Sequence, residues 1–406
     1  MKFLKLLIAF ALACSTLYSM QTRFFNAAYL ADNKVRFHEK NLTTLQLDGV
    51  HIWSSQAYDT HNYKTFLLSY AGPEALLARF VDPTLSAKDN TVVSYSYIDG
   101  HFASNYLVGT FIQNIGSHFF IQLSSSLMYD SLSKVVFIPC SKNGRLLSQQ
   151  EIDQNPALEP YLEKLYASLF TNPTCPQQHA QFVGPTYGLI GYTTSFTDTQ
   201  YIDFVDFSIV TGFIAPRVCL STDSCFYLLG HQDRVNFGIP VQLNATVGLY
   251  DWLNIGASGT VIGFIENDLY MPLNTTNSDN AVLFNQVGFC NVHHKPFFSL
   301  NAYIEGEYFL PRWTWLIGLT YAQQYKTCYQ AYNTELFPTE TINNHPNQFP
   351  WQSTFVTFSS EFDLAQLDKK LMPRCKVSYM LPVHGTSILK TNMFAGQVGF
   401  EMKYAF

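Results

Sequence analysis

Charged residues are scarce in this chain. Asp, Glu, Lys and Arg make up 13 % of the 406 residues, whereas an ordinary globular domain carries roughly 25 %. The 24 Lys and Arg are outnumbered by 30 Asp and Glu, which gives a formal net charge of -6. Because nucleic-acid binding relies on a basic patch or stripe, we expect no nucleic-acid partner.

Long apolar runs are also missing. After the first 20 positions no apolar stretch approaches the roughly 20 residues that a membrane-spanning helix needs. Intrinsic disorder is excluded too, because disordered chains are poor in aromatics and this chain has 16 %. The apolar fraction of 47 % is ordinary and the mean hydropathy is +0.01. Aromatic and small polar residues thus take the place that charge holds in other proteins.

The N-terminus has the layout of a secretory signal peptide. Two lysines lie within residues 1–5, an apolar stretch covers 6–13, and small residues follow up to Ser19. We predict cleavage after Ser19, so that residues 1–19 are the signal peptide and 20–406 the mature chain. Cys14 raises a lipoprotein alternative, but a lipobox favours an aliphatic residue three positions earlier, where Ala11 stands.

The mature chain shows a period of two, which is the signal of β-strands. Between positions 235 and 249 every odd residue is apolar and every even residue is polar, small or proline. This pattern predicts about twelve strands. The predicted strands cover 43–55, 92–112, 117–129, 186–197, 200–213, 235–249, 251–265, 296–310, 312–326, 350–365, 373–383 and 394–406.

The lengths of strands and connections indicate a membrane barrel. A globular strand averages about 5 to 6 residues, whereas a tilted membrane-spanning strand needs about 9 to 11, and the predicted strands are longer still. Short connections alternate with long ones, as in transmembrane barrels. The short connections are 114–116, 198–199, 250, 311 and 365–372, and the long ones are 56–91, 130–185, 214–234, 266–295, 327–349 and 384–392.

We therefore predict an all-β fold, an antiparallel transmembrane β-barrel of about 12 strands, in the range of about 10 to 14, with long extracellular loops. The alternative is a soluble β-sandwich, which would place Lys and Glu on its wet face. Aromatic residues at strand ends favour the barrel, because they form belts at the two membrane interfaces. These aromatics are Trp252, Trp313, Trp315, Trp351, Tyr404 and Phe406.

The last ten residues carry a family resemblance. Gln397, Gly399, Met402, Tyr404 and terminal Phe406 follow an order of polar residue, glycine, spaced hydrophobics and final aromatic. This segment resembles the assembly signal of Gram-negative outer-membrane, porin-like β-barrels. The resemblance implies an integral outer-membrane protein whose last strand is read by the barrel-assembly machinery, with membrane lipid and small solutes as its other partners.

Six of the eight cysteines fall in the predicted extracellular loops. Cys14 lies in the signal peptide and Cys375 in a strand. An oxidising compartment permits disulfides, and we predict the pairs Cys140–Cys175, Cys219–Cys225 and Cys290–Cys328, although spacing alone does not fix connectivity. Cys290 with His293 and His294 raises a metal site as an alternative. No fourth ligand is indicated, so we expect no metal and no cofactor.

Two loop segments have helical spacing. In loop 130–185 the apolar residues are Leu158, Tyr161, Leu162, Leu165 and Leu169. Such a helix either narrows the pore, caps the barrel or meets a partner. A shorter helix is predicted over 73–80 in the first long loop.

Strand alternation identifies lumen-facing charges. The candidates for ion selectivity are Asp206, Glu305, Glu307, Glu361, Asp363 and Glu401. The inward bases are Lys376 and Lys403, so acids outnumber bases. Because acidic rings favour cations, a conducting barrel is expected to be mildly cation-selective; the alternative is that these charges pair inside a filled lumen.

These features favour a channel for small solutes. The channel is expected to be narrow, because a barrel of about 12 strands is intermediate in size between a filled 8-stranded barrel and an open 16-stranded one. One alternative is a structural or surface-recognition barrel acting through its loops. A hydrophobic-compound channel, similar to the fatty-acid channel family, would need an N-terminal plug, for which 20–41 is short and polar. An outer-membrane phospholipase would need a lipid-facing Ser–His pair, and none can be established, so no enzyme is expected. The sequence leaves the solute and the oligomeric state open.

Overall fold

The computed structural model describes most of the chain. The described residues are 42–69, 74–77, 92–156, 158–169, 176–199, 202–215, 218–222, 237–250, 252–273, 286–310, 312–343, 350–363 and 371–403. The predicted signal peptide 1–19 lies outside them, as do Cys175, Cys225, Tyr404 and Phe406. Among the described residues no helix is long and apolar enough to cross a membrane.

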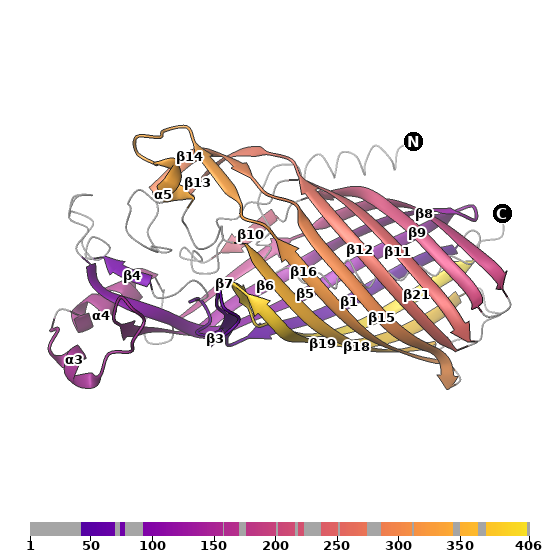
Figure 1. Ribbon diagram of the computed structural model, residues 1–406, viewed down its shortest axis with the longest axis horizontal. Coiled ribbons are helices and arrows are strands. Elements are labelled where there is room, and N and C mark those ends of the chain that lie inside the picture. Colours follow the sequence, from indigo (N-terminus) through magenta and orange to yellow (C-terminus); the bar gives the residue numbers. More distant parts are fainter. Residues whose placement is uncertain are drawn as a thin grey trace.

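Twelve antiparallel strands close into a barrel (Figure 1). Each strand pairs with its neighbours in chain order, and β21 pairs with β1 to close the wall. The fold prediction is confirmed. The wall strands are β1 (Leu42–Ser54), β5 (Val92–Ile115), β6 (Phe119–Cys140), β8 (Thr186–Thr199), β9 (Ile202–Ala215), β11 (Gly238–Tyr250), β12 (Leu253–Phe264), β15 (Phe297–Leu310), β16 (Trp313–Gln324), β18 (Trp351–Asp363), β19 (Leu371–Thr386) and β21 (Asn392–Lys403).

The two-residue alternation separates the faces of this wall. In β12 the burial pattern alternates along the strand, with Asn254 and Ser258 buried toward the lumen and Ile255 exposed on the outside. Large apolar side chains are exposed in the same way on the other wall strands. A single-residue slip would turn each apolar side chain inward, so the alternation fixes the register of the whole barrel.

The two ends of the barrel differ in their connections. At the short-turn end β5 and β6 are joined through Gly116, whose φ of +68° suits glycine. Residues 200–201 join β8 to β9, and 364–370 join β18 to β19. All long connections leave the opposite, long-loop end. The predicted alternation of short and long connections is confirmed.

The β5–β6 hairpin runs far beyond the rest of the wall (Figure 1). The predicted loop 130–185 accordingly begins later, because β6 continues to Cys140. The extension is widened by β7 (Gln177–Val183), β10 (Val218–Thr222) and β4 (Glu74–Leu77). The helix predicted over 73–80 is wrong at 74–77, where β4 pairs with β5 and obtains its backbone hydrogen bonds from that edge.

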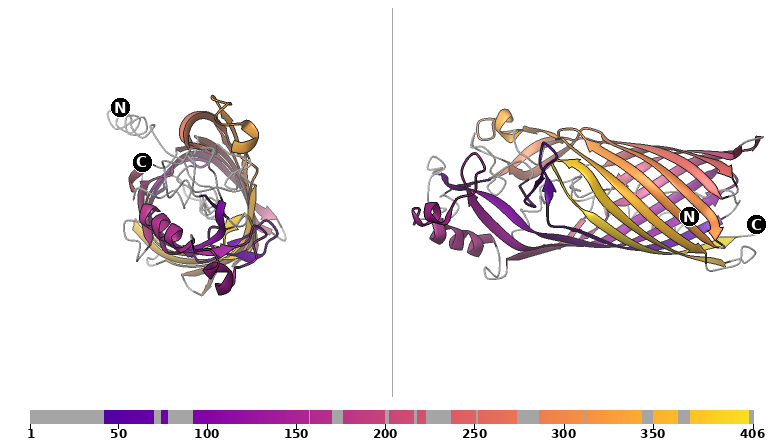
Figure 2. Two further views of the ribbon diagram at one scale, coloured as in Figure 1. Left: turned by 90° about the vertical axis from the view of Figure 1, so that its left-hand side faces the viewer. Right: turned by 60° about the horizontal axis from the view of Figure 1, so that its bottom comes forward.

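The helix predicted in the same loop is present as α4 (Leu158–Leu169), preceded by the short α3 (Gln149–Asp153). Its apolar side chains Tyr161 and Leu165 are buried in a cluster with Val135 and Phe137 of β6. The Tyr166 hydroxyl accepts a hydrogen bond from the backbone N–H of Phe137 at 3.0 Å. The helix therefore covers the β5–β6 extension, beyond the barrel wall (Figure 2).

The β5–β6 extension with α4 forms one lobe at the long-loop end, and a second small lobe lies at the same end. It contains β13 (Asn267–Leu273), β14 (Gln286–His293), β17 (Cys328–Ala331) and α5 (Thr339–Ile342), around a core that includes Phe337 and Ile342. Cys290 pairs in register with Ala331, and Cys328 with His293. This offset of three residues places the two cysteines on opposite faces, Cys290 buried and Cys328 exposed.

The predicted disulfides are not formed where the structure describes both partners. Cys290 and Cys328 are thiols, because opposite faces of a sheet keep their sulfurs apart. Cys140 is also a buried thiol in the structure, whereas its proposed partner Cys175 lies outside the described residues. The pair Cys219–Cys225 stays a prediction, since Cys225 lies outside them as well.

A third, very small sheet lies at the same end and is called the mouth sheet below. It consists of β2 (Ala57–Tyr58), β3 (Lys64–Thr65) and β20 (Ile388–Leu389). Ser54 at the end of β1 donates a hydrogen bond from Oγ to the carbonyl of Lys390 at 2.8 Å. The mouth sheet thereby ties the loop after β1 to the loop after β19.

The thiols allow a direct test of this fold. Burial raises the pKa of Cys140 to about 11, so we expect slow alkylation of Cys140 at pH 8, and protection of buried Cys290, whereas exposed Cys328 reacts at once. Peptide-resolved mass spectrometry after timed alkylation measures all three. Equal labelling of Cys290 and Cys328 in the folded barrel would contradict the arrangement of β14 and β17.

Candidate functional site in the barrel lumen

The inner face of the wall is polar from the short-turn end to beyond the middle of the strands. Small hydroxyl and amide side chains on successive wall strands are buried there and face inward. They are Thr44, Thr110, Asn114, Gln122, Ser124, Ser208, Gln242, Thr246, Asn254, Ser258, Thr320 and Ser378. Many bond across the lumen face; Asn244, for example, donates from Nδ2 to Ser208 at 2.8 Å. These side chains make the inner face of the wall hydrophilic.

Arg374 is the centre of the charged part of this lumen. It lies in β19, where it is opposite Asp363 of β18 and Gly399 of β21. Its guanidinium contacts three carboxylates: Nη2 lies 2.7 Å from Glu401, Nε 3.3 Å from Asp363, and Nη1 3.5 Å from Glu361. The four side chains are between 8 % and 21 % exposed. We call these four residues the Arg374 cluster.

A glycine, Gly399, is the register partner of Arg374 on β21. Gln397, Gly399 and Glu401 share the inward face of β21, and Gly399 stands directly beside Arg374. A Cβ built at position 399 would make ordinary contact with Gln46, at 3.5 Å, and would not meet the Arg374 guanidinium. Two positions of the proposed assembly signal, Gln397 and Gly399, therefore also line the lumen, while Met402 lies next to the strand end.

The other predicted acids lie on neighbouring strands. Glu305 of β15 is 2 % exposed and accepts a hydrogen bond from Asn254 at 3.2 Å. Glu307 follows two residues later, and its backbone N–H donates to the carbonyl of Trp252 at 2.7 Å. Asp206 lies near the start of β9, in register with Thr246 of β11. The structure thus brings Glu361, Asp363 and Glu401 together and leaves Asp206, Glu305 and Glu307 along the adjoining wall.

The list of charged lumen residues from the sequence was incomplete. Arg374 has the same phase as Lys376, so strand alternation alone could have identified it. Asp48 and Asp130 are also buried and lie on inward phases of β1 and β6. Asp130 accepts a hydrogen bond from Ser104. The sequence analysis missed Asp130 because it ended this strand at residue 129, whereas β6 continues to Cys140.

Toward the long-loop end the inner face carries large apolar residues beside polar ones such as Ser353 and Gln324. The sequence analysis did not anticipate these apolar residues. Inward side chains near the long-loop ends of the wall strands form a rim of buried hydrophobic residues. The rim consists of Val50, Ile52, Phe102, Met128, Ile214, Ile262, Phe297, Trp351, Phe355, Met380 and Met393. Trp351, expected in the outer aromatic belt, belongs to this rim: it is 3 % exposed and donates from Nε1 to Gln324 at 3.1 Å.

The mouth sheet packs onto this rim. Tyr58 and Ile388 belong to a buried cluster with Phe297 and Trp351. Ala57, Leu67 and Leu389 belong to a second cluster, together with inward residues of β1, β5 and β6. The Tyr58 hydroxyl donates to the carbonyl of Pro382 at 3.4 Å. The long-loop end of the lumen is consequently narrowed by apolar contacts.

The outer surface of the wall is apolar and bears aromatic residues at both ends. At the short-turn end Trp313 stacks on Phe362, with ring centroids 6.3 Å apart. At the long-loop end Trp53 lies 6.2 Å from Tyr379. Between these ends the exposed residues are large and apolar. Aromatic girdles around an apolar band are the mark of a membrane-spanning barrel, and this chain therefore has the architecture of an outer-membrane β-barrel.

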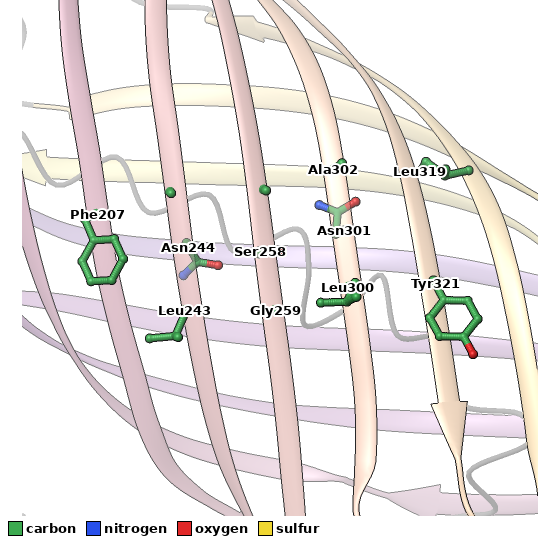
Figure 3. Close-up of a pocket in the computed structure, with 12 residues that line it drawn as sticks. Phe207, Leu243, Asn244, Ser258, Gly259, Leu300, Asn301, Ala302, Leu319 and Tyr321 are labelled. Atoms are coloured by element: carbon green, nitrogen blue, oxygen red, sulfur yellow. The ribbon is translucent and has the colours of Figure 1, made fainter.

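One hollow interrupts this apolar band (Figure 3). Ala245, Ala257 and Ala302 are register partners on β11, β12 and β15, between Phe207 and Leu319 at the ends of the row. The hollow has a volume of about 490 Å³. It arises because three alanines replace the bulky side chains that cover the band elsewhere.

The strand register allows a search for the lipid-facing Ser–His pair that an outer-membrane phospholipase would need. It places Ser131 of β6 opposite His179 of β7, a Ser–His combination that the sequence did not reveal. The Ser131 hydroxyl donates to the carbonyl of Ala103 at 3.2 Å, and the His179 ring bonds to the Tyr129 hydroxyl at 2.8 Å. Both groups are thus engaged elsewhere.

The metal alternative is not supported by the geometry. Cys290 is buried in the core of the second lobe, His293 bonds to Glu266 at 2.6 Å, and His294 bonds to Thr327 at 3.2 Å. The three side chains therefore point to different neighbours. Over the described ranges of the chain, no group of three or more His, Cys, Asp or Glu could hold a metal ion.

No protein-family model matches the chain, and no curated protein matches it. Solved barrels resemble it in shape. The COG4313 outer membrane channel from Pseudomonas putida F1 is 8 % identical, with 91 % of this chain and 98 % of that one covered and a TM-score of 0.48. The transport unit of the autotransporter AIDA-I from Escherichia coli is 8 % identical, with 94 % and 95 % covered and a TM-score of 0.36. At these values the similarity assigns neither a family nor a solute.

The Arg374 cluster makes a prediction about stability. In Arg374→Gln three carboxylates lose their common counter-charge, and breaking a buried ion pair costs about 3 to 5 kcal/mol; the partial exposure of this cluster reduces the expected loss to about 2 kcal/mol. Urea unfolding followed by tryptophan fluorescence measures it. Arg374→Lys, which keeps the charge but not the forked geometry, should lose less. Equal stability of Arg374→Gln and the parent would show that the cluster does not stabilise the barrel.

Proposed function

We propose that this chain is an outer-membrane channel through which small solutes diffuse, with a mild preference for cations. The observation that supports it is the polar short-turn half of the lumen, whose described carboxylates outnumber Arg374 and Lys376. Acidic groups in a narrow pore favour cations.

The charge preference can be measured in planar bilayers under a salt gradient. Neutralising Glu361→Gln together with Glu401→Gln leaves Arg374 with Asp363 alone, so the potassium-to-chloride permeability ratio should fall by about twofold. Glu335→Gln is the matched control, because Glu335 is exposed in the second lobe. No current at any voltage would contradict the channel itself, whereas current with an anion preference would contradict only the selectivity.

The apolar rim favours a second candidate, a channel for small apolar or amphipathic solutes. Such solutes would enter through Phe297, Trp351 and Phe355 at the long-loop end and leave through the polar half. Water and ions gain nothing from an apolar lining, but an apolar solute is stabilised there by about 25 cal/mol per Å² of buried surface.

Trp351 offers a probe for this candidate. A brominated short-chain alcohol that enters the rim should quench Trp351 fluorescence, and Trp351→Phe should remove the quenched part of the signal. A brominated sugar of similar size is the matched polar control. Equal quenching by both compounds would favour the channel for polar solutes.

A further inference from the structure

The mouth sheet brings together two lysines from distant parts of the chain. Lys64 lies in β3, opposite Tyr58 of β2. Lys390 directly follows β20 on the other side of β2, where its backbone N–H donates to the carbonyl of Gln56 at 2.9 Å. Both lysines have the strand phase of Tyr58, so they belong to the same face of the mouth sheet.

Their side chains flank β2 on its two sides and interact across it. Partial burial lowers the pKa of Lys390, and the adjacent charge of Lys64 lowers it further. Two like charges held together destabilise a structure unless a counter-charge offsets their repulsion. The mouth sheet thus holds two positive charges, those of Lys64 and Lys390, whose repulsion does not help it to fold.

No carboxylate within the described ranges forms an ion pair with either lysine. The carboxylate in the turn between β2 and β3 belongs to Asp59, and it is otherwise engaged. Its Oδ1 accepts hydrogen bonds from the backbone N–H groups of His61 and Tyr63, each at 2.8 Å. The part of the chain that the structure describes therefore presents two ammonium groups at the mouth without an acidic partner for them.

We propose that Lys64 and Lys390 form an anion site at the long-loop mouth that takes a phosphate or carboxylate group. Two ammonium groups supply several charge-assisted donors to one anion, and these hydrogen bonds are stronger than neutral ones. The buried side chains of Tyr58 and Ile388 stand beside the site, so an apolar body attached to the anion would meet the rim. The site does not depend on ion conduction and would persist in a barrel that carries no current.

The test is a titration of the folded full chain with inorganic phosphate in an uncharged detergent, followed by calorimetry. Lys64→Gln and Lys390→Gln should each weaken phosphate binding about tenfold, since each removes a charged hydrogen-bond donor. Lys295→Gln is the matched control, because Lys295 is an exposed lysine at the same end of the barrel. Its affinity should equal that of the parent.

A charge reversal separates binding from folding. Lys390→Glu should raise the thermal stability, because Lys64 then faces an acid, and at the same time abolish phosphate binding. Phosphate affinity that is unchanged in this stable variant would overturn the proposal.

A second arm identifies the source of the anion. The parent and the two glutamine variants are placed in nanodiscs of phosphatidylcholine alone or with a phosphorylated glycolipid. Lysine-dependent retention of the glycolipid, with weak binding of inorganic phosphate, assigns the site to a lipid headgroup; tight phosphate binding in both nanodiscs assigns it to a soluble solute. No lysine-dependent binding in any arm refutes the site.

Discussion

The need to satisfy every backbone hydrogen bond without water governs this structure. A sheet in a bilayer has no solvent at its edges, so it must close on itself, and here β21 meets β1 to do so. Closure requires one fixed register around the whole wall, and the register in turn assigns each odd or even position to lipid or lumen. The low charge and high aromatic content of the chain follow from that assignment, because half of each strand must be compatible with lipid.

The same constraint explains why the inner face of the wall, rather than its lipid-facing side, carries a cluster of charged side chains. Arg374 and its three carboxylates lie on the inner face of a wall whose other face is apolar. Toward the opposite end large apolar residues appear among the inward positions, and they meet Tyr58 and Ile388 of the mouth sheet. The barrel thus changes polarity along its axis as well as across its wall, and solutes passing through would encounter two environments in series.

Sequence reasoning recovered the features that depend on local periodicity. The twelve strands, the alternation of connections and α4 follow from the periods of two and 3.6 residues, and the structure confirms them. It missed features that depend on register between distant strands: the meeting of Arg374 with Glu401, the inward position of Trp351, and the opposite faces of Cys290 and Cys328. β4 was mistaken for a helix because its pattern is too short to show a period, and its edge contact with β5 decided the outcome.

The long β5–β6 hairpin has a mechanical consequence. Its strands remain paired from the turn at Gly116 to Tyr95 and Cys140, with one register shift at Asp99, and α4 lies on its far end. A load applied to α4 would pass along this paired ladder, across its one register shift at Asp99, into the wall, where it would shear β6 against β8. α4 and the hairpin extension therefore act as a lever joined to the barrel, and the shift at Asp99 is the place on that lever where the paired strands can bend.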